Sequence, residues 1–345
     1  MSGYRGYNNY RGRTSKGKTV LTVVLILIIL ASIGFMILQK YVVYDAAGTP
    51  RLMLPGRETE EPVLPEEDEE LNLTISPSEQ KAFVSRSFSV TEALTMESWR
   101  KAWTEAPEGC NAVTADMKLS GSGKLLFDAE EMAGGARATK SDTPAALMEL
   151  LQGDTAIGYA VARLSCFHDS TAARWDVENM GLKNTGGYIF YDGNNTQWLD
   201  PAKEGARKYL CNMAVELAEL GFDEILLTDV SYPTEGKLDK IDYGDTVKAR
   251  NLQTFLEEMR AALEPYEVKL SLELREAVLI EGSDNAAGII AADLIPLVDR
   301  LYVQTDAGSV EELRSVVARL AETVEFVPIL SPDGELPAEG SVLLR

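Results

Sequence analysis

From residue 83 onward, short apolar runs alternate with amphipathic stretches, and this alternation constrains the fold more than any other feature of the chain. The runs of strand character are Ser87–Leu94, Asn111–Lys118, Ala156–Cys166, Glu224–Val230, Val268–Leu274, Arg300–Gln304 and Phe326–Leu330. Stretches with the 3.6-residue period of a helix lie between most of them. Because each helix carries the chain back to start another parallel strand, the alternation predicts an α/β fold with a mostly parallel sheet.

The region from residue 83 to residue 345 has the length of a (β/α)8 TIM-type barrel, which typically takes about 250 residues. An eighth strand is expected near Ala277–Ile280 or Gly288–Ala292, and without it the barrel would be incomplete. A doubly wound open sheet is the alternative. No G-x-G-x-x-G motif follows a predicted strand and the sequence contains no P-loop, so we expect no cofactor.

Several helix boundaries can be predicted from local chemistry. Asp200-Pro201 opens one helix, with aspartate as the N-cap and proline in the first helical position, and Gly221 ends it. Ser309-x-x-Glu312 forms a capping box at the start of another helix. The segment Pro144–Leu151 is also expected to be helical.

An apolar segment near the N-terminus, Val20–Leu38, contains no charged residue and would extend for roughly 28 Å as a helix, close to the thickness of the bilayer hydrocarbon. The basic residues before it are Arg5, Arg11, Arg13, Lys16 and Lys18. No acidic residue occurs before Asp45. The positive-inside rule therefore predicts a cytoplasmic basic tail (1–18) and a transmembrane signal anchor (19–39) in contact with the lipid bilayer. A cleaved signal peptide is the alternative, although its apolar region would be shorter.

An acidic, proline-rich linker, residues 40–82, separates this anchor from the barrel domain of residues 83–345. Such a composition cannot bury a core and extends by charge repulsion. With the orientation predicted above, the barrel domain lies outside the cytoplasm. The whole chain has a formal net charge of −21. We expect no nucleic-acid partner, because binding to phosphates depends on an excess of Lys and Arg.

Polar residues lie at the ends of the predicted strands, where barrel enzymes hold their active-site residues. The predicted catalytic carboxylates are Asp116, Asp229 and Glu273. Glycoside hydrolysis needs a pair of carboxyl groups, because one protonates the leaving oxygen and the other acts as nucleophile or activates water. The chain has 54 acidic residues, however, so some acids must fall at strand ends without a catalytic role.

Further side chains near the same strand ends could bind a substrate. The predicted substrate-binding residues are Lys118, Arg163, Asp169, Trp198 and Tyr232. The charged groups would orient a sugar, and the aromatic rings would stack on its apolar face. The single histidine, His168, argues against a His-rich metal centre and makes a Ser-His-Asp triad improbable, so no metal site is expected.

Three segments carry a resemblance to a known family. They are WLDPAKEGARKYLCNMAVELAELGFDEI (198–225), which is the most specific, NAVTADMK (111–118) and ARLSCFHD (162–169). Over roughly residues 85–305 the chain resembles the bacterial "putative glycoside hydrolase" family of barrel domains. The resemblance implies a barrel directed at a carbohydrate, either a polysaccharide or the glycan of peptidoglycan. It also implies that Asp116 and Lys118 match the aspartate and lysine of the family's second strand.

One motif of that family is altered in this chain. After Phe-Asp-Glu-Ile the family reads Gln-Phe-Asp-Tyr-Val-Arg-Phe-Pro, whereas this chain continues LLTDVSYP (226–233). The family's aspartate falls on Thr228, and Asp229 follows one residue later. Because side chains alternate between the two faces of a strand, Asp229 would turn away from the barrel mouth unless the strand bulges or ends there. The family's next carboxylate falls near Glu273.

Two functional hypotheses follow. The first is a membrane-anchored, extracytoplasmic glycoside hydrolase that acts on cell-wall or extracellular polysaccharide through strand-end carboxylates. The alternative is a catalytically degenerate barrel that binds glycan or a protein partner at the cell envelope, which the threonine at position 228 favours. A third hypothesis, a tethered structural module whose cytoplasmic tail is the functional part, has less support in the sequence.

Overall fold

The computed structural model describes residues 42–44, 50–52, 82–88, 96–130 and 157–345, apart from 334, 335 and 338. The chain divides into two compact units, Met1–Ile75 and Ser76–Arg345. In the first unit, strands β1 (Val42–Tyr44) and β2 (Pro50–Leu52) pair antiparallel. Within the described residues no helix is long and apolar enough to cross a bilayer. The predicted anchor, residues 19–39, lies outside them.

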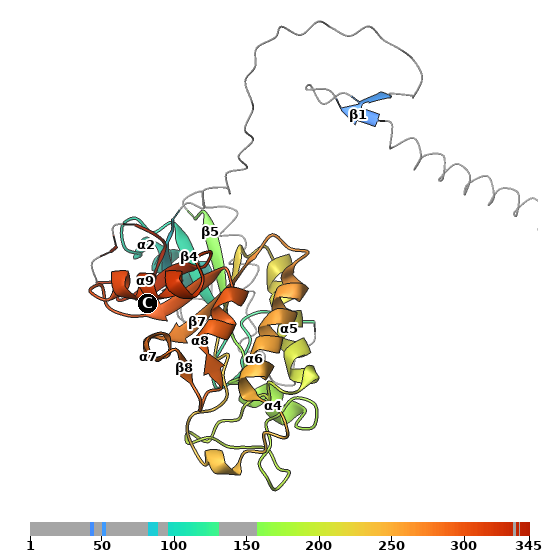
Figure 1. The fold of residues 1–345 in the computed structure, drawn as a ribbon. Coiled ribbons are helices and arrows are strands. Elements are labelled where there is room, and N and C mark those ends of the chain that lie inside the picture. The colour runs from blue at the N-terminus through green and yellow to red at the C-terminus, as the bar shows by residue number, and fades with distance from the viewer. Residues whose placement is uncertain are drawn as a thin grey trace, which may run out of the picture. The chain divides into compact units, whose positions relative to one another are not determined.

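In the second unit, eight strands form a closed barrel (Figure 1). They are β3 (Val84–Phe88), β4 (Ala112–Lys118), β5 (Tyr159–Ser165), β6 (Glu224–Thr228), β7 (Lys269–Arg275), β10 (Arg300–Gln304), β11 (Glu325–Leu330) and β12 (Val342–Leu344). All of the pairings between them are parallel, and β12 closes the ring against β3. The predicted (β/α)8 barrel is confirmed, and the open-sheet alternative is wrong.

The eighth strand lies elsewhere than predicted. Ala277–Ile280 belongs to helix α7 (Glu276–Glu281), in which Val278 and Leu279 supply the buried face. Gly288–Ala292 contains β9 (Ile289–Ile290), which pairs antiparallel with β8 (Ser283–Asp284) outside the barrel, and the first two residues of a helix. The strand that completes the barrel is β12, and its three residues are too few to show a period of two.

The remaining helices surround the strands. They are α2 (Met96–Thr104), α4 (Ser170–Trp175), α5 (Glu204–Glu219), α6 (Lys248–Leu263), α8 (Ala291–Leu294) and α9 (Val310–Leu320), with short 3-10 turns η2 (Leu238–Lys240) and η3 (Ile295–Leu297). Most of the predicted strand Ser87–Leu94 and the whole predicted helix Pro144–Leu151 lie outside the described residues.

Two predicted helix caps are wrong. Helix α5 begins at Glu204, and Asp200 instead closes the preceding turn by accepting a 3.0 Å hydrogen bond from the backbone N–H of Ala202. Ser309 stands at the N-cap position of α9, but its side chain makes no capping hydrogen bond. Its φ and ψ of −93° and −8° are helical, whereas a capping side chain needs an extended backbone to reach back over the first turn.

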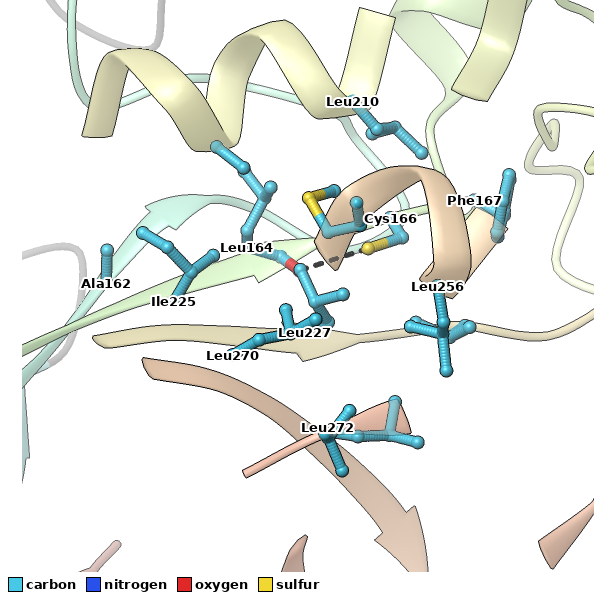
Figure 2. Packing of buried hydrophobic residues seen from close by; sticks show 14 of the residues in the cluster. Ala162, Leu164, Cys166, Phe167, Leu210, Ile225, Leu227, Leu256, Leu270 and Leu272 are labelled. Atoms are coloured by element: carbon cyan, nitrogen blue, oxygen red, sulfur yellow. Dashed lines mark hydrogen bonds between the residues drawn. The ribbon is translucent and has the colours of Figure 1, made fainter. Parts of the chain in front are cut away.

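Alternate residues of each strand bury two separate apolar layers. On β6, Ile225 and Leu227 point outward, whereas Leu226 points into the barrel. The outward layer packs against side chains such as Leu210 of α5 and Leu256 of α6 (Figure 2). The strands are therefore held in place from both sides, which fixes where their C-terminal ends lie.

The N-terminal end of the barrel is closed by a buried ionic cluster. Arg300 Nη1 lies 2.5 Å from Glu224 Oε2, and their side chains are 2% and 0% exposed. Arg300 Nε also donates to Glu325 at 2.7 Å. The Tyr159 and Ser271 hydroxyls donate to Glu224, so the buried carboxylate has partners for both of its oxygens. The charged groups at this end of the barrel are thus buried and paired with one another.

Candidate active site

A pocket of about 350 Å³ lies at the C-terminal ends of the strands, and we refer to it as the mouth pocket. Strand residues Arg163, Thr228, Glu273 and Gln304 line it together with loop residues that include Ser120, Trp198, Asp229, Ser231, Ala287 and Ile289. A larger cavity of about 790 Å³ lies at the opposite end, where it contacts Lys269 and Asp299. Barrel enzymes place their active sites at the C-terminal end of the strands, so the mouth pocket is the candidate site.

Asp229 reaches the mouth pocket through an unusual backbone conformation. Strand β6 ends at Thr228, and Asp229 has a φ of +52°, in the left-handed region that few residues other than glycine adopt. Its Oδ2 accepts a 2.6 Å hydrogen bond from the Ser165 hydroxyl at the end of β5. The sequence predicted that Asp229 could face the mouth only if the strand bulged or ended there. Strand β6 does end before Asp229, and Asp229 lines the mouth pocket.

Asp116 and Glu273 are joined by one guanidinium group. Arg163 Nη1 lies 3.0 Å from Asp116 Oδ1, and Arg163 Nη2 lies 3.1 Å from Glu273 Oε2. Burial alone would lower the pKa of Arg163, but Glu273 and Asp116 raise it above its ordinary value. The guanidinium of Arg163 therefore stands between the two carboxyl groups and pairs with both of them.

A second arginine also holds Glu273. Arg345, next to the end of β12, donates from Nη2 to Glu273 Oε1 at 2.8 Å and from Nη1 to Oε2 at 3.1 Å. It also donates to Gln304 at 3.2 Å. Both oxygens of Glu273 therefore act as acceptors. The sequence pattern did not point to Arg345, because the strand before it had not been recognised.

The carboxylate pair that faces the pocket is therefore Asp229 with Glu273. Both side chains line the mouth pocket, whereas Asp116 does not. Among the residues that the structure describes, no basic side chain lies within ion-pair distance of Asp229, which its Ser165 hydrogen bond holds in place. The two groups thus differ in their partners: arginines contact both oxygens of Glu273, whereas a serine hydroxyl contacts Asp229.

Lys118 and Asp169 lie beneath the site rather than in it, which corrects their prediction as substrate-binding residues. Lys118 Nζ lies 2.8 Å from Asp169 Oδ2, and both side chains are 0% exposed. Lys118 also donates to the backbone carbonyl of Ser165, and Asp169 Oδ1 caps α4 by accepting from Ala172 N–H. A register shift on β4 lies between Asp116 and Lys118, and their side chains differ in burial: that of Asp116 is 22% exposed, whereas that of Lys118 is 0% exposed.

Tyr232 is buried and cannot stack on a sugar, so its predicted role as a platform is wrong. Its side chain is 1% exposed, and its hydroxyl accepts a 2.8 Å hydrogen bond from Asn251. Its backbone N–H donates to Ala287 O, and Lys248 lies 5.6 Å from the centre of its ring. Tyr232 instead supports the β8–β9 hairpin, from which Ala287 and Ile289 line the pocket.

Trp198 lines the mouth pocket, although only 8% of its surface is exposed. Its ring stacks on His168 with centroids 4.3 Å apart, and its Nε1 donates to Asp192 at 2.8 Å.

Within the described part of the chain, no three His, Cys, Asp or Glu side chains gather in a way that could hold a metal ion.

The chain was compared with known proteins. A sequence profile described as "Putative glycosyl hydrolase domain" matches residues 94–301. Among solved structures, a hypothetical protein from Ruminiclostridium thermocellum ATCC 27405 is 24% identical, with a TM-score of 0.47 over 54% of this chain and 95% of that chain. The PgaB (BpsB) glycoside hydrolase domain from Bordetella bronchiseptica is 13% identical, with a TM-score of 0.49 over 72% of this chain and 84% of that chain.

No curated protein matches the chain. The matched profile spans more than half of the 345 residues, from the approach to α2 through to β10. This agrees with the family resemblance carried by the Trp-Leu-Asp-Pro to Gly-Phe-Asp-Glu-Ile block, residues 198–225. The chain belongs to the family described as "Putative glycosyl hydrolase domain".

Proposed function

We propose that this protein is a membrane-anchored, extracytoplasmic glycoside hydrolase that acts on cell-wall or extracellular polysaccharide. The observation that carries the proposal is the left-handed backbone of Asp229, which brings this residue into the lining of the mouth pocket that Glu273 also lines. A non-glycine residue held in this region of φ stores strain, and such strain is concentrated at functional sites.

The environments of the two carboxylates suggest their roles. Asp229, which has no basic side chain within ion-pair distance among the described residues, is assigned as the acid that protonates the glycosidic oxygen. Glu273 accepts hydrogen bonds from Arg163 and Arg345, so it suits the ionised group that attacks or stabilises the sugar cation. Trp198 would flank the bound sugar ring.

The proposed location follows from the N-terminal sequence. Residues 19–39 would anchor the chain in the membrane with residues 1–18 in the cytoplasm, and residues 40–82 would act as the spacer. The chain enters the barrel at the N-terminal end of β3, whereas the mouth pocket opens at the C-terminal ends of the strands. This topology suits a tethered barrel that presents its pocket to a polymer outside the cell.

Hydrolysis can be tested by measuring release of reducing ends from cell-wall and extracellular polysaccharides by the full-length chain. Asp229→Asn and Glu273→Gln are each expected to lower the rate by about 10²–10⁴-fold, the range for loss of a catalytic acid or base. Asp293→Asn, an exposed residue on α8, is the matched control and should leave the rate unchanged. Equal rates for Asp229→Asn and the control would rule out the proposed acid.

A second candidate function, glycan binding without turnover, is favoured by one observation. Asp116 and Glu273 are both engaged by Arg163, and Thr228 stands where the family has aspartate. A glycan that binds to the full-length chain, loses affinity in Trp198→Ala and is never cleaved would favour this candidate. Cleavage that depends on Asp229 would rule it out.

A further inference from the structure

A chain of hydrogen bonds leads from the edge of the mouth pocket to a buried carboxylate. Ser120, in the turn after β4, lines the pocket, and its Oγ lies 3.1 Å from His168 Nδ1. His168 Nε2 lies 2.7 Å from Thr196 Oγ1, which donates to Asp192 Oδ2 at 2.5 Å. His168 Nε2 is itself 3.6 Å from the same carboxylate oxygen. None of these residues has a role in the glycoside chemistry proposed above.

The direction of each hydrogen bond follows from the groups involved. Thr196 gives its single hydroxyl proton to Asp192, so it can only accept from His168. The neutral imidazole of His168 therefore carries its proton on Nε2, which leaves Nδ1 as the acceptor that faces Ser120. The arrangement presents the serine hydroxyl as a donor to an imidazole base.

Asp192 is held as an anion at the far end of the chain. Burial alone would raise the pKa of Asp192, but hydrogen bonds from Thr196 and Trp198 lower it below its ordinary value. Its Oδ1 also accepts from the backbone N–H groups of Asn194 and Thr196. An ionised carboxylate this close to the ring stabilises the imidazolium that forms when His168 accepts a proton.

The imidazole of His168 is also fixed by packing. It stacks on Trp198 with an interplanar angle of 12°, and its side chain keeps 20% of its surface exposed. A Cβ atom on Gly121 would approach His168 Cε1 to 3.3 Å, so the glycine beside the serine allows the ring to come close. Gly121 has a φ of +72°, which a glycine adopts without strain.

We propose that Ser120 is the nucleophile of an acyl-transfer site that removes O-acyl groups from a carbohydrate. Ser120 Oγ attacks the ester carbonyl while His168 Nδ1 takes its proton, and the sugar oxygen leaves with that proton. Water then attacks the acyl-serine and gives a proton to His168, the carboxylic acid departs, and His168 returns the proton to Ser120. The net reaction is ester plus water to alcohol plus carboxylic acid.

Two features distinguish this site from the usual Ser-His-Asp arrangement. The ring turns Nδ1 rather than Nε2 toward the serine, and Thr196 relays the contact with Asp192. Such constellations are defined by geometry and role rather than by residue order, and here each role is filled. The backbone N–H of Ser120 has no acceptor among the residues that the structure describes, so it can donate to the oxyanion, as the nucleophile's own N–H does in such sites.

Acyl transfer can be tested without any sugar, so its outcome is independent of the proposed glycoside hydrolysis. The full-length chain is treated with a fluorophosphonate probe, the labelled peptide is mapped by mass spectrometry, and hydrolysis of p-nitrophenyl acetate is followed. We expect the label on Ser120, and Ser120→Ala should lower ester hydrolysis by about 10²-fold or more. The neighbouring Ser122→Ala is the matched control, because Ser122 is exposed and does not contact His168.

A second pair of variants separates a catalytic relay from a structural role. Thr196→Val breaks the link to Asp192 and should slow both labelling and hydrolysis, whereas Thr196→Ser keeps the hydroxyl and should restore them. An unreactive wild-type chain, a label on another serine, or full activity in Ser120→Ala would overturn the proposal.

The carbohydrate half of the proposal rests on the proposed function of the barrel. It predicts that the wild-type chain releases acetate from an O-acetylated polysaccharide and that Ser120→Ala does not. Hydrolysis of the simple ester without release of acetate from any such polysaccharide would overturn this half. Reducing ends are counted separately in the same reactions, so failure of glycoside cleavage is not confused with failure of acyl transfer.

Discussion

The two ends of the barrel carry similar charged side chains in opposite surroundings. At the N-terminal end, Arg300 and Glu224 are 2% and 0% exposed. At the mouth, Arg163 and Asp116 are 21% and 22% exposed, and Glu273 is 17% exposed. Both clusters place an arginine between two carboxylates, and the one at the mouth contributes Arg163 and Glu273 to the lining of the mouth pocket.

This difference shows that burial, rather than residue type, separates the structural cluster from the candidate site. At the N-terminal end, Arg300 lies over the rings of Phe83 and Tyr159. At the mouth, the charged groups keep contact with solvent, and Asp229 adds a carboxylate that has no basic side chain within ion-pair distance among the described residues. We therefore expect changes at the N-terminal end to reduce stability and changes at the mouth to reduce function.

The largest effect on stability is expected for Glu224→Gln. The substitution leaves the buried Arg300 without its closest carboxylate, and breaking such a buried pair costs about 3–5 kcal/mol. The free energy of unfolding can be measured by denaturant titration. Glu325→Gln, which changes the more exposed partner of the same arginine, is the control and should cost less. Equal losses in the two variants would show that burial does not separate them.

Gly288→Ala should cause the next largest loss of stability. It tests how closely the β8–β9 hairpin, which lines the mouth pocket, packs against its neighbours. A Cβ atom there would lie 2.6 Å from Lys248 Cβ, so the β8–β9 hairpin must shift, at a cost of about 1–3 kcal/mol. The control is Gly282→Ala. The φ of Gly282, +79°, is similar to that of Gly288, but no atom lies within 4 Å of a Cβ placed there. A crystal structure or hydrogen exchange would detect the shift; identical stabilities of the two variants would contradict it.

Substitutions of Asp229 should cause a smaller loss of stability, and they test whether its left-handed backbone is strained. Asp229→Ala should cost about 1–2 kcal/mol, because alanine tolerates a φ of +52° poorly. Asp229→Asn should change the free energy of unfolding by less than about 0.5 kcal/mol, since asparagine accepts this conformation and can still accept from Ser165. Thermal or denaturant unfolding of both variants tests this, and equal losses would argue against backbone strain.

The smallest effect is expected for Asp116→Asn. Its ion pair with Arg163 is partly exposed, so the loss should stay below about 1 kcal/mol and should shrink further in high salt. The loss in Glu224→Gln should persist in high salt. Unfolding curves at low and high ionic strength would test this contrast between the two ends, and a salt-insensitive loss of several kcal/mol in Asp116→Asn would break it.

Much of the barrel could be predicted from the sequence, because long strands and helices leave periodic patterns. Arg300–Gln304 was predicted with the bounds that the structure has, and Asn111–Lys118 differs from β4 by one residue. The strand β12 was missed because three residues carry no pattern. The cap at Asp200 was wrong because the same residue types that start a helix also close a turn.

The candidate site was predictable only in part. Of the predicted site residues, Arg163, Glu273 and Trp198 line the mouth pocket, and Asp229 joins them because β6 stops at Thr228; their roles there stay predictions. Nothing in the sequence distinguishes Lys118 and Asp169 from charged residues on the surface, but in the structure they form a fully buried ion pair. Their pairing joins residues that are far apart in the chain, and such contacts leave no local signal.

The sequence by itself determined the class of the fold and the family, because apolar periodicity and the Trp-Leu-Asp-Pro to Gly-Phe-Asp-Glu-Ile block are local properties of the chain. Only the tertiary structure decided which polar groups meet. Closing the ring brought Arg345, which follows the last strand, onto Glu273, and the left-handed backbone of Asp229 places this residue in the lining of the mouth pocket. The physical reason is that ion pairs, burial and backbone strain depend on distances across the barrel, which no stretch of sequence contains.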